Sequence, residues 1–219
     1  MSLARYLANL LNSSGQVEAA KLAATLDLSS KTLTYPDNSV QSADIASLAA
    51  SKLSGQVPDA NAPSGSVIQV VQAVKTDTFS SSSNSWVDVT GWSASITPLS
   101  ASSKILVMAG AYTSHSVSNG FAYFKLVRNN TDVVVGDSRG NATRATMDAS
   151  QQTAGSPWVW AKHSSIVFLD SPSSTSSVTY KFQMLCSNST LTFVGGTATV
   201  DDANRSNVPT TITLMEIAA

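Results

Sequence analysis

One segment in the last quarter of the chain carries the most restrictive pattern in the sequence. In "SVTYKFQMLCS", residues 177–187, every second position is apolar: Val178, Tyr180, Phe182, Met184 and Cys186. Side chains of a β-strand point alternately to opposite faces, so a period of two predicts a strand with one face in a core. The single cysteine, at the end of this series, is interpreted as a buried apolar residue rather than a reactive thiol.

Strand-like segments recur from Ser66 to the end of the chain, and turn signals such as Asn119-Gly120 and Gly195-Gly196 separate them. The run "SKILVMAGAYT" is apolar on both faces, which predicts a central strand or one buried against another subunit. About nine or ten short strands without a strong helix pattern are expected. We therefore predict a mainly β chain, with a jelly-roll-like antiparallel β-sandwich over about residues 65–219.

The first 62 residues have a different character. Five apolar residues at helical spacing predict one face of a short helix that is too short to be stable alone: Leu3, Tyr6, Leu7, Leu10 and Leu11. We interpret this stripe as a candidate attachment or oligomerisation surface. The predicted organisation is an N-terminal attachment segment at 1–54, a Pro-containing linker at 55–65 and a β-sandwich head at 66–219. A floppy N-terminal arm is the alternative.

Charge and hydropathy exclude several partners. Only 12% of the 219 residues are charged and the net charge is −1, so no field attracts nucleic acid or an anionic membrane. No segment approaches the roughly 18 apolar residues that a membrane span requires. We expect neither a nucleic-acid partner nor a membrane partner.

The sequence also offers little that would support catalysis. Two histidines, His115 and His163, lack the spacing of a metal site, and the chain has only two glutamates, whereas a glycosidase needs two carboxylates across a cleft. No phosphate loop, dinucleotide fingerprint or nucleophile elbow is present. We therefore expect no catalytic residues, no metal and no cofactor.

One long polar insertion, Gly136 to Pro157, shows no strand or helix pattern, and loops of that length are usually functional or mobile. A tryptophan pair follows it at a spacing that shares one face of a strand. The candidate receptor-binding residues in this region are Asp137, Arg139, Arg144, Asp148, Trp158 and Trp160. Ordinary solvated loop charges, and core or interface packing of the tryptophans, are the alternatives. Tyr112, Phe121 and Tyr123 are expected to be core or interface residues.

An ordered set of segments resembles a β-domain of phage proteins. The set comprises "GSVIQVVQAVKTDTFSSSSNSWVDVTG", "ITPLSASSKILVM", "FKLVRNNTDVVVGDSRG", "FLDSPSSTSSVTYKFQ" and the ending "TLMEIAA". It is similar to the C-terminal domain of tail-fibre-like and head-fibre-like proteins of tailed phages, over about residues 65–219. The opening "MSLARYLANLLNSSGQV" resembles their short N-terminal segment. The resemblance implies a non-enzymatic virion component, usually trimeric, with an attachment end and a distal jelly-roll-like head. It supplies no binding residues.

The expected function is therefore a bacteriophage virion structural protein on the phage tail or capsid surface. A homotrimeric tail fibre would present the head to a host-surface glycan and bind other virion proteins through its N-terminus. Repeated subunits would give avidity from weak single sites. A capsid head fibre or decoration protein of the same architecture is the main alternative. A trimeric lectin of a cell and a glycan-degrading enzyme are further alternatives.

Overall fold

The structure is a computed structural model that describes residues 62–117, 119–152, 161–197, 203 and 205–219. The predicted N-terminal stripe between Leu3 and Leu11 lies outside the described residues, as do Trp158 and Trp160. The predicted segment 1–54 and most of the linker 55–65 also fall there, so the proposed domain boundaries stay predictions.

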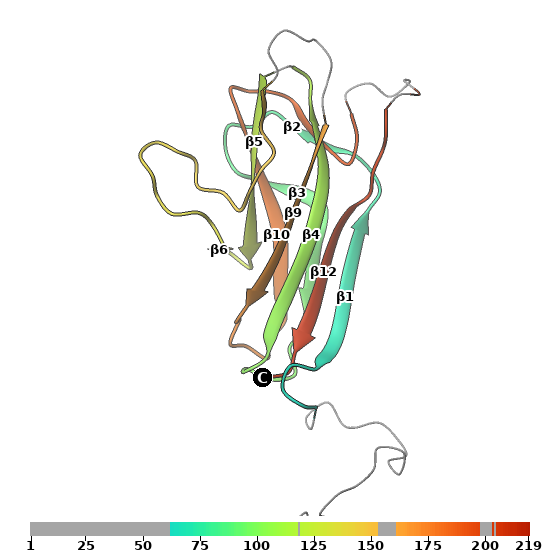
Figure 1. The fold of residues 1–219 in the computed structure, drawn as a ribbon, viewed down its shortest axis with the longest axis vertical. Coiled ribbons are helices and arrows are strands. Elements are labelled where there is room, and N and C mark those ends of the chain that lie inside the picture. Colours follow the sequence, from blue (N-terminus) through green and yellow to red (C-terminus); the bar gives the residue numbers. More distant parts are fainter. Residues whose placement is uncertain (1–61, 118, 153–160, 198–202, 204) are drawn as a thin grey trace, which may run out of the picture. The chain divides into compact units, whose positions relative to one another are not determined.

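Two antiparallel sheets, and no helix, make up the secondary structure of the described residues (Figure 1). The first sheet contains β1 (Val67–Lys75), β2 (Phe79–Ser81), β4 (Lys104–His115), β9 (Ala161–Asp170), β11 (Thr192–Val194) and β12 (Thr210–Ile217). The second sheet contains β3 (Val87–Ile96), β5 (Asn119–Arg128), β6 (Thr131–Val133), β7 (Met147–Asp148), β8 (Gln151–Gln152) and β10 (Val178–Ser187).

Several short strands pair with consecutive stretches of the same partner strand, so each set of them acts as one interrupted strand. β12 and β11 pair with consecutive stretches of the same edge of β4, and β1 and β2 pair with them in turn. In the same way β6, β7 and β8 share one edge of β5. If β1 and β2, β6 to β8, and β11 and β12 are each counted as one strand, the described residues form eight strands, numbered 1 to 8 along the sequence. One sheet then has the strand order 1-8-3-6 and the other has the order 2-7-4-5. This is the strand order of a jelly roll, which confirms the predicted jelly-roll-like β-sandwich.

The core lies between the sheets and is centred on Trp92 of β3. Its indole stacks on Phe182 at a centroid distance of 3.9 Å and meets the ring of Phe124 edge-on at 5.3 Å. The indole N–H donates a 2.9 Å hydrogen bond to the carbonyl oxygen of Thr211 in the first sheet. A fully buried tryptophan thus has its one polar atom satisfied while it joins the two layers.

The two segments singled out by pattern behave largely as predicted. In β10 buried and half-buried residues alternate along the whole strand, and Cys186 is a buried free thiol. β4 is central, with β11 and β12 on one edge and β9 on the other. Its inward residues Ile105 and Val107 are fully buried, whereas Met108 on its outer face is exposed in the single chain.

Two local predictions were wrong. Asn119-Gly120 forms the start of β5 instead of a turn, and a Cβ atom on Gly120 would overlap the ring of His115. Glycine is needed at this position for close packing, not for turn conformation. The insertion after Gly136 is also not entirely irregular, because β7 and β8 lie within it and pair with β5. Gly195, with a φ of +82°, does end β11 as the turn signal indicated.

Candidate receptor-binding groove

The insertion begins as an exposed loop that projects from the side of the sandwich after β6 (Figure 1). Internal hydrogen bonds hold its shape: Arg144 Nε donates to the carbonyl oxygen of Gly136 at 2.7 Å, and the Gly136 amide donates to Ala145 at 3.1 Å. Asp137 and Arg139 are exposed. A narrow neck therefore closes the loop, and a predicted site residue, Arg144, helps to form this neck.

The returning half of the insertion packs on the sandwich. Met147 and Ala149 are buried, so Asp148 between them is directed outwards, paired with Tyr123 in the register of β7 and β5. Asp148 Oδ1 accepts a 2.7 Å hydrogen bond from the Ser150 amide, and its Oδ2 lies 3.7 Å from Nζ of Lys162. More than half of this carboxylate side chain remains exposed.

Two shallow depressions meet at Tyr123 and Asp148. One, of about 310 Å³, is lined by these two residues together with Asp137, Arg144 and the neck of the loop. The other, of about 400 Å³, is lined by the same two residues with Phe121 and Ser150. We call the pair the β5 groove. It brings together three predicted site residues, Asp137, Arg144 and Asp148, while Arg139 does not line it.

The aromatic part of this groove was not predicted. Phe121 and Tyr123 were expected in the core or at an interface, but β5 alternates, with Ala122 and Phe124 buried inwards and these two rings half-buried on the outer side. The period-two pattern of "GFAYFKL" separates two apolar faces, with Ala122, Phe124 and Leu126 on one and Phe121 and Tyr123 on the other. Which of two apolar faces meets the core depends on the partner sheet, which the segment alone does not specify.

The two histidines have structural or surface positions. His115 is buried at the end of β4, where Nε2 lies 2.8 Å from the carbonyl oxygen of Ala149 and Nδ1 lies 2.9 Å from the Thr192 hydroxyl. Burial lowers the pKa of His115 below its ordinary value, so the neutral ring is favoured. His163 is exposed on β9. Within the described ranges, no group of three His, Cys, Asp or Glu side chains is placed to hold a metal ion.

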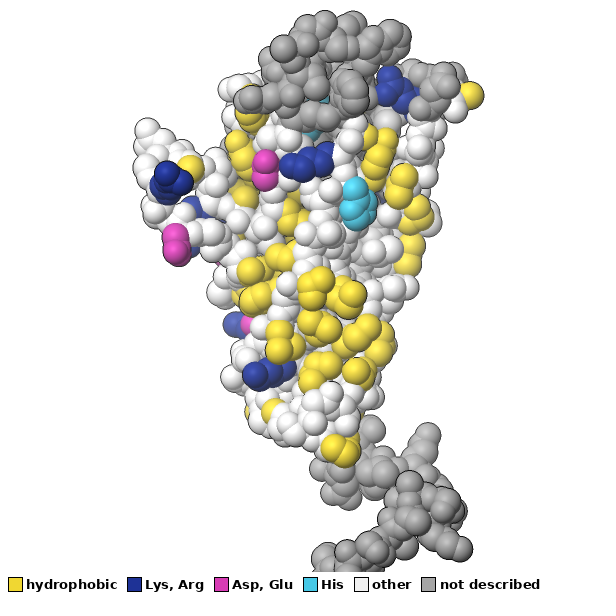
Figure 2. Space-filling model, viewed as in Figure 1, with side chains coloured by type: hydrophobic (Ala, Val, Ile, Leu, Met, Phe, Trp, Pro, Cys, Tyr) yellow, Lys and Arg dark blue, Asp and Glu magenta, His cyan; other side chains and the backbone are white. Residues whose placement is uncertain are grey.

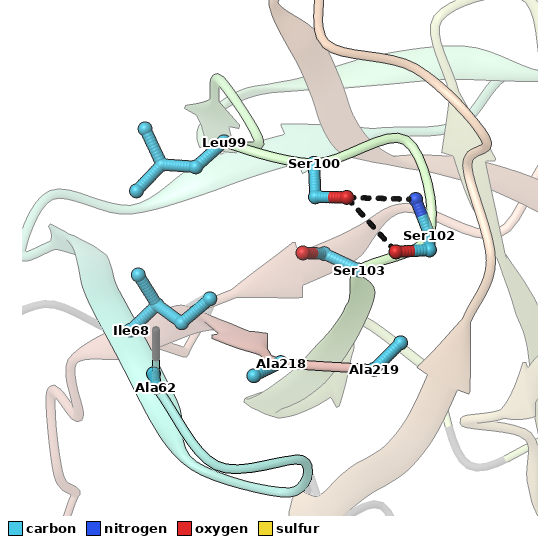
Figure 3. Close-up of a pocket in the computed structure, with 8 residues that line it drawn as sticks. All are labelled: Ala62, Ile68, Leu99, Ser100, Ser102, Ser103, Ala218 and Ala219. Atoms are coloured by element: carbon cyan, nitrogen blue, oxygen red, sulfur yellow. Dashed lines mark hydrogen bonds between the residues drawn. The ribbon is translucent and has the colours of Figure 1, made fainter. Parts of the chain in front are cut away.

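A larger pocket, of about 580 Å³, lies at the end of the sandwich where β1 begins (Figure 3). Leu99 and Ile68 line it from opposite sides, and serine side chains of the β3–β4 loop face it, as do Ala218 and Ala219. The residues lining it carry no charged side chain. Its chemistry is therefore less selective than that of the β5 groove, although its volume exceeds that of either depression of the groove.

Behind this pocket lies a buried carboxylate, Glu216. Its oxygens accept hydrogen bonds from Gln69 Nε2 at 2.5 Å and from the Leu99 amide at 2.8 Å. Burial acts to raise the pKa of Glu216, but the hydrogen bonds outweigh it and hold the pKa below its ordinary value. This group fixes the β3–β4 loop to the first sheet, which is a structural role.

The solved structures named here resemble this chain only weakly. No model of a known protein family matches the chain, and no curated protein matches its sequence. Among solved structures, it is similar to a protein of infectious bursal disease virus strain Gx, with 18% identity and a TM-score of 0.31. A second similar structure, the T13 particle of the same virus, has 16% identity and a TM-score of 0.31. The match covers 69% of this chain but 37% and 36% of those chains. We base no functional argument on similarity at this level.

In the part of the chain that the structure describes, no helix is long and apolar enough to cross a membrane.

Proposed function

We propose that the chain is a bacteriophage virion structural protein: a trimeric tail fibre whose jelly-roll head adheres to glycans on the host surface. The proposed role is adhesive and not enzymatic. The resemblance over residues 65–219 supplies the virion context, and the jelly-roll order fits it, because this architecture recurs in viral capsid and lectin domains. A fold is shared by many functions, so the proposal depends on a site.

The observation that carries the adhesive role is the β5 groove. Tyr123 and Phe121 offer half-buried ring surfaces, and Asp137, Asp148 and Arg144 provide charged hydrogen-bonding groups around them. A sugar ring presents a flat C–H face and a rim of hydroxyls, which match an aromatic surface bordered by carboxylates. The groove is shallow and open, so a single site would be weak. Three copies on one fibre would bind through avidity.

Binding of purified full-length chain to host cells tests the groove. We expect Tyr123→Ala and Asp148→Asn each to weaken cell binding by about tenfold, the equivalent of roughly 1.4 kcal/mol. Thr90→Ala is the matched control, since this exposed residue lies on β3 of the same sheet, outside the groove. Unchanged binding by both groove variants, with folding intact, would refute the adhesive site.

Antibody labelling of intact virions tests the structural role and its location. Labelled tails are expected for the tail fibre. Labelled capsids would instead support a head fibre or decoration protein, the main alternative. Labelling of neither part would overturn the virion proposal.

A further inference from the structure

The outer face of the first sheet is apolar although nothing in the described chain covers it. We define the apolar face as the outward side chains of β1, β4, β9 and β12 that are hydrophobic: Val67, Val70, Val74, Leu106, Met108, Val167, Leu169, Met215 and Ile217. Val167 is 67% exposed and Val70 55%. Figure 2 shows the hydrophobic side chains gathered in the lower half of the view, over these strands.

The register makes this face continuous. Val70 pairs with Met215, Met215 with Leu106, and Leu106 with Leu169, so one apolar row crosses all four strands. In a second row, Met108 pairs with Val167. Residues paired across strands share a face, so the side chains of each row form one surface. The face is therefore built by the sheet itself and does not depend on loops.

Charge is nearly absent from the apolar face. Lys104, paired with Ile217 at the start of β4, places one positive charge at its margin. Within the face two neutral residues bond to each other: Gln72 Nε2 donates to the Thr213 hydroxyl at 2.8 Å. The outer face of the second sheet differs, because it carries ion pairs such as Lys181–Asp88 at 2.8 Å. A neutral face can pack against a copy of itself without electrostatic repulsion, whereas the second sheet presents a solvated surface.

The size of the face suits a subunit interface. Four strands about 4.8 Å apart and eight residues of about 3.3 Å each give roughly 19 Å by 26 Å, or about 500 Å². Three such faces would bury about 1,500 Å² in total, shared among the three contacts of a trimer. A short helix at residues 3–11, as the sequence predicts, would be only about 14 Å long and would cover a minor part of this area.

We infer that further copies of this chain cover the apolar face, and that the heads of the proposed trimer pack through it. This inference depends on the trimeric assembly in the proposed function. In a closed ring each copy uses two different patches, one toward each neighbour. The apolar face provides them at its two borders, with Val70 and Val74 on β1 and Val167 and Leu169 on β9.

Charge placed at either border tests the inference in the full-length chain. We expect the wild type to have three times the 22.8 kDa chain mass by light scattering after size exclusion, and Val70→Lys and Val167→Lys each to shift it toward the single-chain mass. Both side chains are largely exposed in one chain, so neither variant should unfold it, which circular dichroism verifies. Thr90→Lys, on the outer side of the second sheet, is the control that keeps the trimer.

Oxidation of Met108 by dilute peroxide gives a second measurement, made on the wild type and on a folded monomeric variant. Met108 is 40% exposed in the single chain, so contact with other copies should slow its oxidation in the wild type and dissociation should restore it. Protection that persists in a monomeric variant would show that the chain covers its own face, which would overturn the inference.

The outcomes separate this inference from the proposed function. A trimer that both lysine variants leave intact would overturn the interface while the virion role stands. A monomeric wild type would overturn the interface too, and virion labelling would then decide the function independently.

Discussion

The hydroxyl of Tyr180 donates a 2.7 Å hydrogen bond to Oδ2 of Asp170, and this bond connects the two sheets. Arg128, at the end of β5, donates to the same oxygen at 2.7 Å. Asp170 is buried at the end of β9, so its negative charge is compensated by one cation and one neutral donor. Three strands from two layers thus meet at one carboxylate.

Tyr180→Phe should destabilise the fold moderately. The ring and its packing remain, and Asp170 keeps Arg128, so only one hydrogen bond to a charged group is lost, about 1.5–3 kcal/mol. Asp170→Ala should cost more, about 3–5 kcal/mol, because it leaves Arg128 without its carboxylate. Denaturant unfolding monitored by fluorescence measures both. Equal losses for the two variants would contradict this assignment of roles.

His115 should make the fold sensitive to mild acid. Because burial lowers its folded-state pKa, the unfolded chain takes up a proton at a higher pH than the folded one does. The contribution of neutral His115 to the free energy of unfolding is therefore complete above its ordinary pKa of 6.5. This contribution is lost as the pH falls below that value toward the lower pKa of the folded state. The free energy of unfolding, measured from pH 7.5 to 5, should fall in this window. His115→Gln should flatten the slope.

Glu216→Gln should loosen the β3–β4 loop. The substitution replaces one carboxylate oxygen, an acceptor, with a side-chain NH₂ group, a donor. This group would face either Gln69 Nε2 or the Leu99 backbone N–H, which are also donors, so one hydrogen bond would be lost. The expected cost is about 1–3 kcal/mol. Hydrogen exchange of the Leu99 amide should accelerate in the variant. Wild-type protection of that amide after the substitution would contradict the proposed anchoring.

Gly120→Ala should destabilise the chain through contact with His115. The added Cβ would overlap the imidazole ring, which is itself held by hydrogen bonds at both nitrogens, so relief requires movement of β4 or β5. A cost of about 1–3 kcal/mol is expected for such overpacking. Gly136→Ala is the matched control, because its nearest neighbouring atom would lie at 3.9 Å. Thermal unfolding of the two variants should therefore differ clearly.

The sequence predicted those parts of the fold that depend on local periodicity. β10 was predicted because Val178 to Cys186 alternate, and β4 because its run is apolar on both faces. The pairing of β7 with β5 was missed because Met147-Asp148 is too short to show a period. Asn119-Gly120 has the composition of a turn, and only the approach of His115 explains its extended conformation.

Prediction of the site was limited in the same way. Asp137, Arg144 and Asp148 were found because charges in a long insertion are conspicuous, but Tyr123 was assigned to the core or an interface. Its outward direction follows from the packing of Phe124 against Trp92, a contact between strands far apart in the sequence. The aromatic half of the groove could therefore be identified only from the structure.

The pairing of β12 with both β1 and β4 has a consequence for biosynthesis. β12 lies between β1 and β4 in the first sheet, although it follows them and all the other strands in the sequence. Nearly the whole head must therefore emerge from the ribosome before β12 can insert between them. Contacts that join distant parts of a chain form slowly, because loop closure precedes any gain in energy. During translation the nascent sheet would hold β1 and β4 without the strand between them. The first sheet is therefore completed only after β12 has left the ribosome, and products truncated before Thr210 cannot complete it.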